Sequence, residues 1–269
     1  MKRSSPRLSR LLLSVAACGA LLLTACGHGA QNTAANPAPT TASSGDGADA
    51  STDAGGAGGA PPADASLPPG AQPGLDDLNG DSTPDPTCGQ QDFGGGLVLR
   101  IPCTIPNPNE PDDGVRLVKD SLFRLPSFDA DLTGISGSLV TARDAAGKKV
   151  VVIVFNSDNL FATGSDQLGE SNTLTPVVTL INNRFAGGTI QVRGHTDKTG
   201  TASANQALSE RRAATVKTFL TGHGVNAGGV SSVGLGSSQP LAEESNPDGS
   251  PSLPGRAFNR RVEIAIRLP

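Results

Sequence analysis

Hydrophobic and polar residues follow two different periods in the second half of the chain. Apolar residues recur at helical spacing over 174–183 and again over 204–223. Between and around these segments, β-branched or alternating runs predict four strands, at residues 149–155, 189–193, 230–235 and 261–267. Strands that alternate with helices predict an α/β fold, in which βαβ crossovers pack the helices on one face of a mixed sheet.

A different pattern precedes this domain, for which we expect the boundaries 146–269. Between 88 and 145, short apolar runs at 96–101 and 121–125 are separated by Pro, Asn, Asp and Gly, which is typical of short strands joined by turns. We therefore predict a small, strand-rich preface rather than a second large domain.

Still closer to the N-terminus, residues 26–87 are dominated by Ala, Gly, Pro, Ser, Thr and Asp. Up to Pro86 this region has no Lys or Arg and almost no large apolar residue. Burial cannot offset the conformational entropy of such a segment, so it is predicted to be a disordered tether.

Residues 1–25 are typical of an export signal, with a basic start and an apolar stretch at 11–23 that is too short to span a membrane. The small residues before Cys26 resemble the bacterial lipoprotein signal, which implies that Cys26 is lipidated and becomes the mature N-terminus. An ordinary signal peptide that is cleaved nearby is the alternative. The lipoprotein interpretation places the protein in the cell envelope, held by membrane lipid at the outer membrane or at the outer face of the cytoplasmic membrane.

The cysteine count fits an exported protein. Cys18 leaves with the signal and Cys26 is acylated, so Cys88 and Cys103 remain as an even pair. Such a pair in an oxidising compartment predicts a disulfide, and two free buried thiols are the alternative.

Composition excludes one class of partner. The formal net charge is −4, and the chain contains no Trp or Tyr. Without a basic stripe and interleaved aromatic residues, nucleic acid is not an expected partner.

One charge lies at an unusual place in the second predicted helix. Leu208, Val216 and Leu220 are expected to face the sheet, and Arg212 falls on the same row. A guanidinium at the edge of a core needs a partner, and Asp197, on the preceding loop, is the expected one in the unliganded protein. The same two groups can instead hold the carboxylate and the ammonium of an amino acid. A plain salt bridge and a ligand clamp therefore both stay open.

Motifs across this region resemble those of the OmpA-like C-terminal domain, a family shared by outer-membrane proteins, peptidoglycan-associated lipoproteins and flagellar stator proteins. They are Gly194-His195-Thr196-Asp197, Gly200, Asn205, Leu208-Ser209, Arg212-Ala213, Gly234-Leu235-Gly236 with Pro240, Gly255-Arg256-Ala257 and Asn259-Arg260-Arg261-Val262-Glu263-Ile264. The resemblance extends from about 117 to 268.

The resemblance implies noncovalent binding of peptidoglycan through the diaminopimelate of its stem peptide. Asp197 would hold the ammonium and Arg212 the carboxylate, while Thr199 and Asn205 match further polar contacts. Asn205 is also expected to cap the helix.

Two positions depart from the family pattern. Ala162 stands where an acidic or amide residue is usual, which implies the loss of one ligand contact. Pro176 interrupts the first helix, which should start late or kink. His195, beside a strand end, is interpreted as a hydrogen-bonded structural residue, with a ligand role as the alternative.

Acidic residues at the end of the tether form a separate pattern. Asp77, Asn79, Asp81 and Asp85 resemble a thrombospondin type-3 or dockerin-like calcium loop, with Ser82 in place of the usual glycine. A solvated acidic linker is the alternative, and no other cofactor is expected.

These observations favour a lipid-anchored binding module that grips the cell wall, and they argue against an enzyme. No zinc cluster is present in the sequence, and Ser209 lacks a plausible base. Two alternatives remain: an adaptor whose preface docks another envelope protein, and a cell-wall hydrolase.

Overall fold

The computed structural model describes residues 67–105, 111, 114–128, 132, 134–169 and 173–269. The predicted export signal, Cys26 and the tether up to residue 66 lie outside the described residues. No helix within the described residues is long and apolar enough to cross a membrane.

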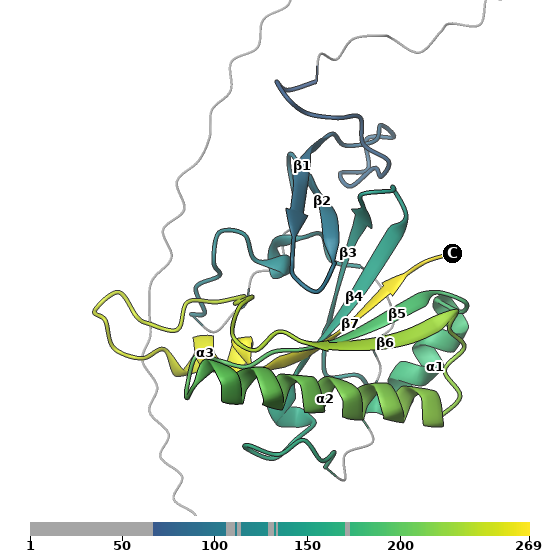
Figure 1. Ribbon diagram of the computed structural model, residues 1–269. Helices are drawn as coiled ribbons and strands as arrows, with labels where there is room; N and C mark the ends of the chain where they lie inside the picture. Colours follow the sequence, from purple (N-terminus) through teal and green to yellow (C-terminus); the bar gives the residue numbers. More distant parts are fainter. Residues whose placement is uncertain (1–66, 106–110, 112–113, 129–131, 133, 170–172) are drawn as a thin grey trace, which may run out of the picture. The chain divides into compact units, whose positions relative to one another are not determined.

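The described strands form one seven-stranded sheet in the order β1-β2-β3-β4-β7-β5-β6 (Figure 1). The strands are β1 (Thr87–Asp92), β2 (Val98–Pro102), β3 (Ser138–Asp144), β4 (Lys149–Asn156), β5 (Thr189–Gly194), β6 (Gly229–Gly234) and β7 (Arg261–Arg267). The helices are α1 (Leu174–Arg184), α2 (Ala202–Gly222) and α3 (Leu253–Asn259). Only β5 and β6 pair in parallel, and α2 connects them. The predicted α/β fold with a mixed sheet is therefore confirmed.

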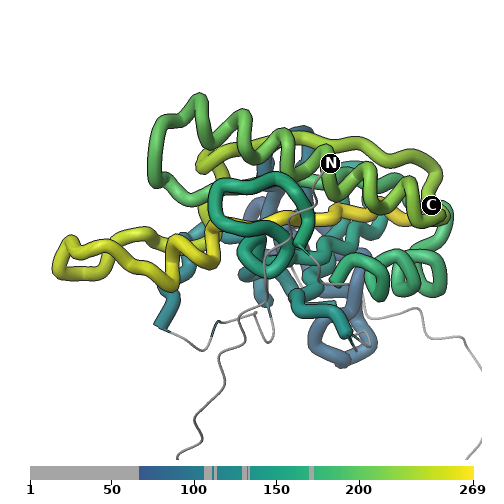
Figure 2. The backbone as a smooth tube through the Cα atoms, turned by 90° about the horizontal axis from the view of Figure 1, so that it is seen from below, coloured from purple at the N-terminus to yellow at the C-terminus, as the bar shows by residue number. Residues whose placement is uncertain are grey.

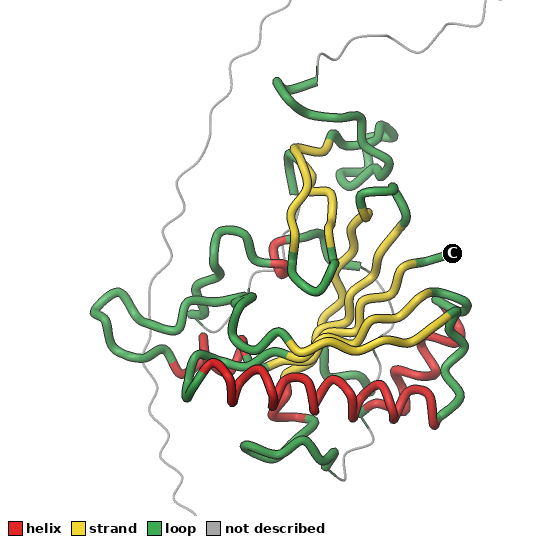
Figure 3. Tube along the Cα trace, viewed as in Figure 1, coloured by secondary structure: helices red, strands yellow, loops and turns green. Residues whose placement is uncertain are grey.

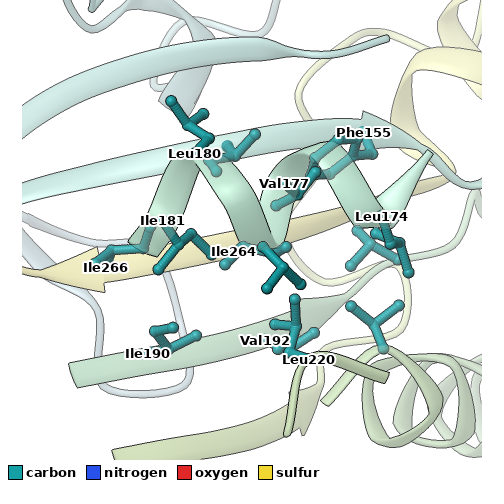
Figure 4. Packing of buried hydrophobic residues seen from close by; sticks show 14 of the residues in the cluster. Phe155, Leu174, Val177, Leu180, Ile181, Ile190, Val192, Leu220, Ile264 and Ile266 are labelled. Carbon is teal, nitrogen blue, oxygen red and sulfur yellow. The ribbon is translucent and has the colours of Figure 1, made fainter. Parts of the chain in front are cut away.

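Helices α1 and α2 lie together on one face of the sheet. Figure 3 shows this arrangement by secondary structure, and Figure 2 shows it from the side of the helices. Alternate residues of β4, namely Val151, Ile153 and Phe155, lie in one buried cluster with Val177 and Ile181 of α1. Figure 4 shows Phe155, Val177 and Ile181 in this cluster. Each fully buried aliphatic side chain of this kind stabilises the fold by roughly 1.5–3 kcal/mol.

The other face of the sheet is also buried, and the preface covers it. Val150 and Val152 of β4 lie in a second cluster with Leu97, Leu99 and Leu122. The ring of Phe123 meets that of Phe258, from α3, edge to face at 4.9 Å between centroids. A strand of Val and Ile that is buried on both faces explains why 149–155 reads as a continuous apolar run.

The preface is continuous with the main sheet. Strands β3 and β4 form a hairpin whose turn spans the predicted boundary at 145/146, with Gly147 at φ 82°. Val140 and Val152 are among the paired residues. The turn residues at 145–148 mark the end of a strand. In the sequence, a turn between two domains and a turn within a hairpin look the same.

The short run at 121–125, expected as a strand, is a 3-10 turn at Leu122–Arg124. The Ser121 hydroxyl accepts the N–H of Phe123 and so begins the turn. Periodicity over five residues cannot distinguish these two conformations.

The described residues begin within the range predicted as tether. Asp76 forms a bidentate ion pair with Arg143 of β3, with both N–O distances at 2.7 Å, and Gln72 pairs with Thr87 as an isolated bridge. The predicted disulfide is confirmed, because Cys88 in β1 is bonded to Cys103 just after β2.

Helix α1 starts at Leu174, so Pro176 lies in its first turn. The first N–H groups of a helix have no intrahelical acceptor, and a proline costs little there. The helix therefore begins where the helical spacing at 174–183 predicts, with Pro176 in its first turn.

Candidate functional site

The loop that follows β5 carries the first predicted site residue. Thr201 is the N-cap of α2, since its hydroxyl accepts the N–H of Ala204 at 3.2 Å. The prediction that Asn205 caps this helix is wrong, because Asn205 lies one turn inside α2. Its buried amide instead donates to the carbonyl oxygens of Asp197 and Thr199, each at 3.0 Å. Asn205 thereby holds the loop in the shape that presents Asp197.

Asp197 forms its ion pair with Arg260, at the start of β7. Its Oδ2 accepts from Arg260 Nη1 at 2.7 Å, and its Oδ1 accepts the N–H of Thr199 at 2.9 Å. Burial raises the pKa of Asp197, but the hydrogen bonds from Arg260 and Thr199 outweigh it and bring the pKa below its ordinary value. Asp197 is therefore a carboxylate at neutral pH.

Arg260 joins two acidic residues. Besides Asp197, it binds Asp158, which accepts from Arg260 Nη2 at 2.7 Å. The hydrogen bond to Asp158 is the main cause that raises the pKa of Arg260, and the bond to Asp197 adds to it. Arg260 was not among the residues predicted from the sequence for this site. The signal was present, since Arg260 belongs to one of the motifs that carry the family resemblance.

The predicted ion pair between Asp197 and Arg212 does not form. Arg212 is buried, and its Nε donates to the carbonyl oxygen of Ser165 at 2.8 Å. Its guanidinium carbon lies 5.1 Å from the ring centroid of Phe161. Among the described residues, no carboxylate lies within ion-pair distance of Arg212. Burial lowers its pKa, and an arginine nevertheless stays charged at neutral pH.

Asp197 and Arg212 nonetheless line the same pocket, which has a volume of about 410 Å³. Thr199 and Asn205 line it as well, so the structure brings all four predicted peptidoglycan-binding residues together. The other lining residues are Asp158, Thr163, Gly164, Thr196, Leu208, Leu253, Arg256 and Arg260. Leu208 is half-buried at this pocket rather than in the core.

Close contact between α2 and the strand ends keeps Arg212 beside the pocket. A Cβ atom at Gly194 would lie 2.2 Å from the carbonyl oxygen of Ser209, so only glycine fits there. The Ser209 hydroxyl accepts the N–H of Gly236 at 2.9 Å. The serine is thus occupied in holding the helix to the loop after β6.

Glu244 supports the Asp197 loop from the opposite side. Its carboxylate accepts the backbone N–H of Lys198, at 3.0 Å and 3.1 Å to its two oxygens, and the side-chain amide of Asn259 at 2.8 Å. These bonds tie the loop to the segment that delivers Arg260.

His195 belongs to a separate, buried cluster. Glu263 bonds to Arg193 at 2.8 Å and to Arg261 at 2.7 Å, and the Nε2 atom of His195 lies 3.3 Å from Glu263 Oε1. The angles at that contact do not meet hydrogen-bond geometry, and neither ring nitrogen has another partner among the described residues. Burial, assisted by Arg261, lowers the pKa of His195 to about 4, so the ring is neutral at pH 7.

Glu263 itself stays ionised. Burial alone would raise its pKa, but the guanidinium groups of Arg261 and Arg193 bring the pKa well below its ordinary value. His195 does not line the pocket, and its buried position in this cluster agrees with a structural rather than a ligand-binding role.

The suggested calcium loop is held by its own hydrogen bonds. Asp77 accepts the N–H groups of Gly80 and Ser82, and Asn79 donates to Asp81 and Asp85. Among the described residues, no group of three or more His, Cys, Asp or Glu side chains is arranged to hold a metal. Calcium binding by this loop stays a prediction.

The fold is an α/β domain with a mixed sheet and two helices on one face. Its pocket contains an aspartate and an arginine that do not pair with each other, and this arrangement of charges suits a zwitterionic ligand. Residues 160–252 match the OmpA family. The chain therefore contains an OmpA-family domain, which confirms the resemblance predicted from the motifs.

Three relatives from different organisms are similar to part of this chain. Photosystem I P700 chlorophyll a apoprotein A2 of Gloeobacter violaceus is 40% identical over 116 residues, which are 43% of this chain and 13% of that protein. The peptidoglycan-binding protein ArfA of Mycobacterium tuberculosis is 40% identical over 77 residues, 29% of this chain and 22% of ArfA. The probable lipoprotein YiaD of Escherichia coli is 36% identical over 96 residues, 36% of this chain and 41% of YiaD.

The chain spans less than half the length of each of these relatives.

Proposed function

We propose that this protein is an envelope protein that binds peptidoglycan noncovalently, by holding the diaminopimelate of the stem peptide in the pocket between Asp197 and Arg212. The observation that carries the proposal is that these two residues line one pocket without neutralising each other. A salt bridge between them would have left neither charge available to a ligand. Instead, a buried guanidinium lines the pocket, and its contacts among the described residues are carbonyl oxygens and an aromatic ring.

The free end of diaminopimelate offers an ammonium and a carboxylate on one carbon. Asp197 can accept the ammonium, because each carboxylate oxygen has a second lone pair beyond the bonds to Arg260 and Thr199. Arg212 can bind the carboxylate through parallel charge-assisted hydrogen bonds. Both groups are mostly buried, which strengthens each interaction relative to water.

Thr199 and Asn205 complete the pocket in this proposal. Asn205 fixes the loop, and the backbone of Thr199 orients the Asp197 carboxylate. Ala162 contributes its carbonyl oxygen to a long contact of 3.5 Å with Arg212, whereas its methyl group offers no polar contact to a ligand. The name of ArfA as a peptidoglycan-binding protein supports the assignment.

We also propose that Cys26 carries the lipid that attaches the protein to a membrane. The lipoprotein-like signal supports this, and so does the description of YiaD as a probable lipoprotein. Changing Cys26 to Ala should release the protein from the membrane fraction and leave wall binding intact, because one acyl chain binds marginally and several bind firmly. Undiminished membrane association of Cys26→Ala would refute the anchor.

The proposal assigns no reaction to the pocket. Ser209, beside it, is bonded to backbone groups, and the pocket lining contains no histidine or cysteine. Incubation with purified sacculi separates binding from hydrolysis: a binding module sediments with the wall and releases no soluble fragments, whereas a hydrolase releases muropeptides.

The same assay tests the clamp. Asp197→Ala and Arg212→Ala should each lower co-sedimentation at least roughly tenfold, since each leaves a ligand charge unpaired in a desolvated site. Arg211→Ala is the matched control, because Arg211 is the next residue of α2 and pairs with Asp166 at an exposed position. Circular dichroism must show each variant folded. Wild-type sedimentation by folded Asp197→Ala and Arg212→Ala would place the recognition site elsewhere.

A further inference from the structure

Arg256 is a second arginine of the pocket lining that has no hydrogen-bonded acid. It lies on α3, its side chain is 32% exposed, and its Nε atom is buried without a hydrogen-bond partner among the described residues. The nearest acid is Glu244, with 3.9 Å between Arg256 Nε and Glu244 Oε2, which is too long for a hydrogen bond. The oxygens of Glu244 already accept from Lys198 and Asn259.

The residues that line the pocket carry more positive than negative charge, and Glu244, 3.9 Å from Arg256, is not part of the lining. The lining contains two acidic residues, Asp158 and Asp197, and three arginines, at positions 212, 256 and 260. Arg260 bonds to both acids. A ligand with one ammonium and one carboxylate leaves the excess of one positive charge unchanged. A ligand with one ammonium and two carboxylates brings the total to four charges of each sign.

An apolar side chain lies next to Arg256. Leu253 precedes Arg256 by three residues on α3 and therefore shares its face. Leu253 also lines the pocket, although its side chain is 70% exposed, which is the highest exposure among the large hydrophobic residues of the described chain. Together these two side chains suit a carboxylate that has a small apolar group beside it.

We propose that Arg256, with Leu253, forms a second subsite that binds another carboxylate of the peptidoglycan stem peptide, in addition to the one held by Arg212. This inference rests on the proposed function. Two groups of the stem peptide have the required chemistry: the C-terminal carboxylate of the peptide and the α-carboxylate of the glutamyl residue that precedes diaminopimelate. The subsite would make the protein sensitive to amidation or extension of the peptide outside the diaminopimelate itself.

The test uses soluble synthetic stem peptides and isothermal titration calorimetry on the folded, unlipidated protein. Three tetrapeptides are compared: one with all carboxylates free, one with a C-terminal amide and one with an amide at the glutamyl α-carboxyl. We expect one of the two amides to weaken wild-type binding roughly tenfold, as expected when a charge-assisted contact is lost. The amide that weakens binding identifies which carboxylate lies at Arg256.

The variant Arg256→Gln supplies the second half of the experiment. It should bind the free peptide roughly tenfold more weakly than wild type does and should not distinguish the free peptide from the sensitive amide. Arg211→Gln serves as the matched control and should behave as wild type. If neither amide weakens wild-type binding, or if Arg256→Gln keeps the wild-type preference, the second subsite is refuted while the proposed function stands.

Failure of the proposed function has a different outcome. In that case the wild-type protein binds none of the three peptides, and Arg212→Ala does not differ from it. A drop in affinity of Arg212→Ala for all three peptides, together with selective loss in Arg256→Gln, supports both claims separately. Because the amides test the wild-type chain directly, the result does not depend on the stability of the variants.

Discussion

Two arginine-rich clusters lie close together in the sequence and differ in how their charges are satisfied. In the buried cluster, Glu263 lies between Arg193 and Arg261, and all three side chains are almost fully excluded from solvent. In the pocket, the acids are bonded to Arg260, and Arg212 has no acidic partner among the described residues. Neighbouring residues of one motif, Arg260 and Arg261, thus serve opposite purposes.

The difference follows from which groups the fold delivers to each arginine. Arg193 also donates to the carbonyl oxygens of Phe93 and Gly94, in the turn between β1 and β2, and Arg261 donates to that of Gln239 at 2.8 Å. The bonds from Arg193 close the buried cluster with backbone from the preface, and the bond from Arg261 adds backbone from the loop after β6. In the pocket, Arg212 has no acidic partner among the described residues and stays available to a ligand. A cluster in which every charge has a partner contributes to the specificity of the fold, whereas a cluster with an arginine that lacks an acidic partner can bind a ligand.

The largest effect is expected from breaking the buried cluster. Glu263→Ala leaves two guanidinium groups buried without their carboxylate, which should cost about 3–5 kcal/mol of unfolding free energy. Chemical denaturation of the wild type and the variant measures this difference. Asp158→Ala, which removes a partner from the half-exposed Arg260, should cost far less. Equal losses in the two variants would contradict the contrast between the clusters.

Reduction of the disulfide should act on one cluster only. In the chain-entropy model, closing a loop of this length contributes roughly 3 kcal/mol. The loop contains Phe93 and Gly94, so reduction should increase hydrogen exchange in β1 and β2 and weaken the cover of Arg193. Exchange at the Asp197 loop and binding to sacculi should stay unchanged. Loss of wall binding on reduction would show that the two regions are coupled.

The pH dependence of stability should come from the buried cluster in a defined window. The pKa of His195 is about 4 when folded and 6.5 for the free side chain, so between these values the unfolded chain binds a proton that the folded chain does not. The free energy of unfolding therefore falls as the pH drops from 6.5 to 4. The expected loss is about 3 kcal/mol, because each tenfold change in proton affinity corresponds to roughly 1.4 kcal/mol.

His195→Asn is the test of that window. Thermal unfolding of this variant should vary much less than wild type between pH 7 and pH 4. The acids with lowered pKa, Asp197 and Glu263, lose their contribution only as the pH falls below the ordinary value of about 4 for a carboxyl, so they do not produce the same slope. An unchanged pH profile in His195→Asn would show that His195 does not produce this pH dependence.

The smallest change is expected in the pocket itself. Arg212→Lys keeps the positive charge but not the planar pair of donors, so sacculus binding should fall several-fold with little change in stability. Co-sedimentation at several protein concentrations measures the loss. Wild-type affinity in Arg212→Lys would mean that the pocket needs only a charge at this position.

The sequence by itself determined most of the secondary structure of the domain and the identity of four of its pocket residues. The apolar run of β4, the alternation of β5 and the helical spacing of α2 are local patterns, and each corresponds to an observed element. The motif resemblance placed Asp197, Thr199, Asn205 and Arg212, which the structure brings to one pocket. Local periodicity and short motifs suffice for such statements because they depend on residues that are near each other in the chain.

Only the tertiary structure decided which charges meet. Arg212 was the plausible partner of Asp197 because α2 follows the Asp197 loop directly, but β7 lies beside β5 in the sheet and delivers Arg260 to that carboxylate. The same holds for the preface, whose hairpin joins the sheet through β3 and closes the buried cluster over Arg193. Ion pairs and strand neighbours between residues 60 to 100 positions apart leave no local pattern, since their geometry depends on the sheet order and not on the spacing of residues along the chain.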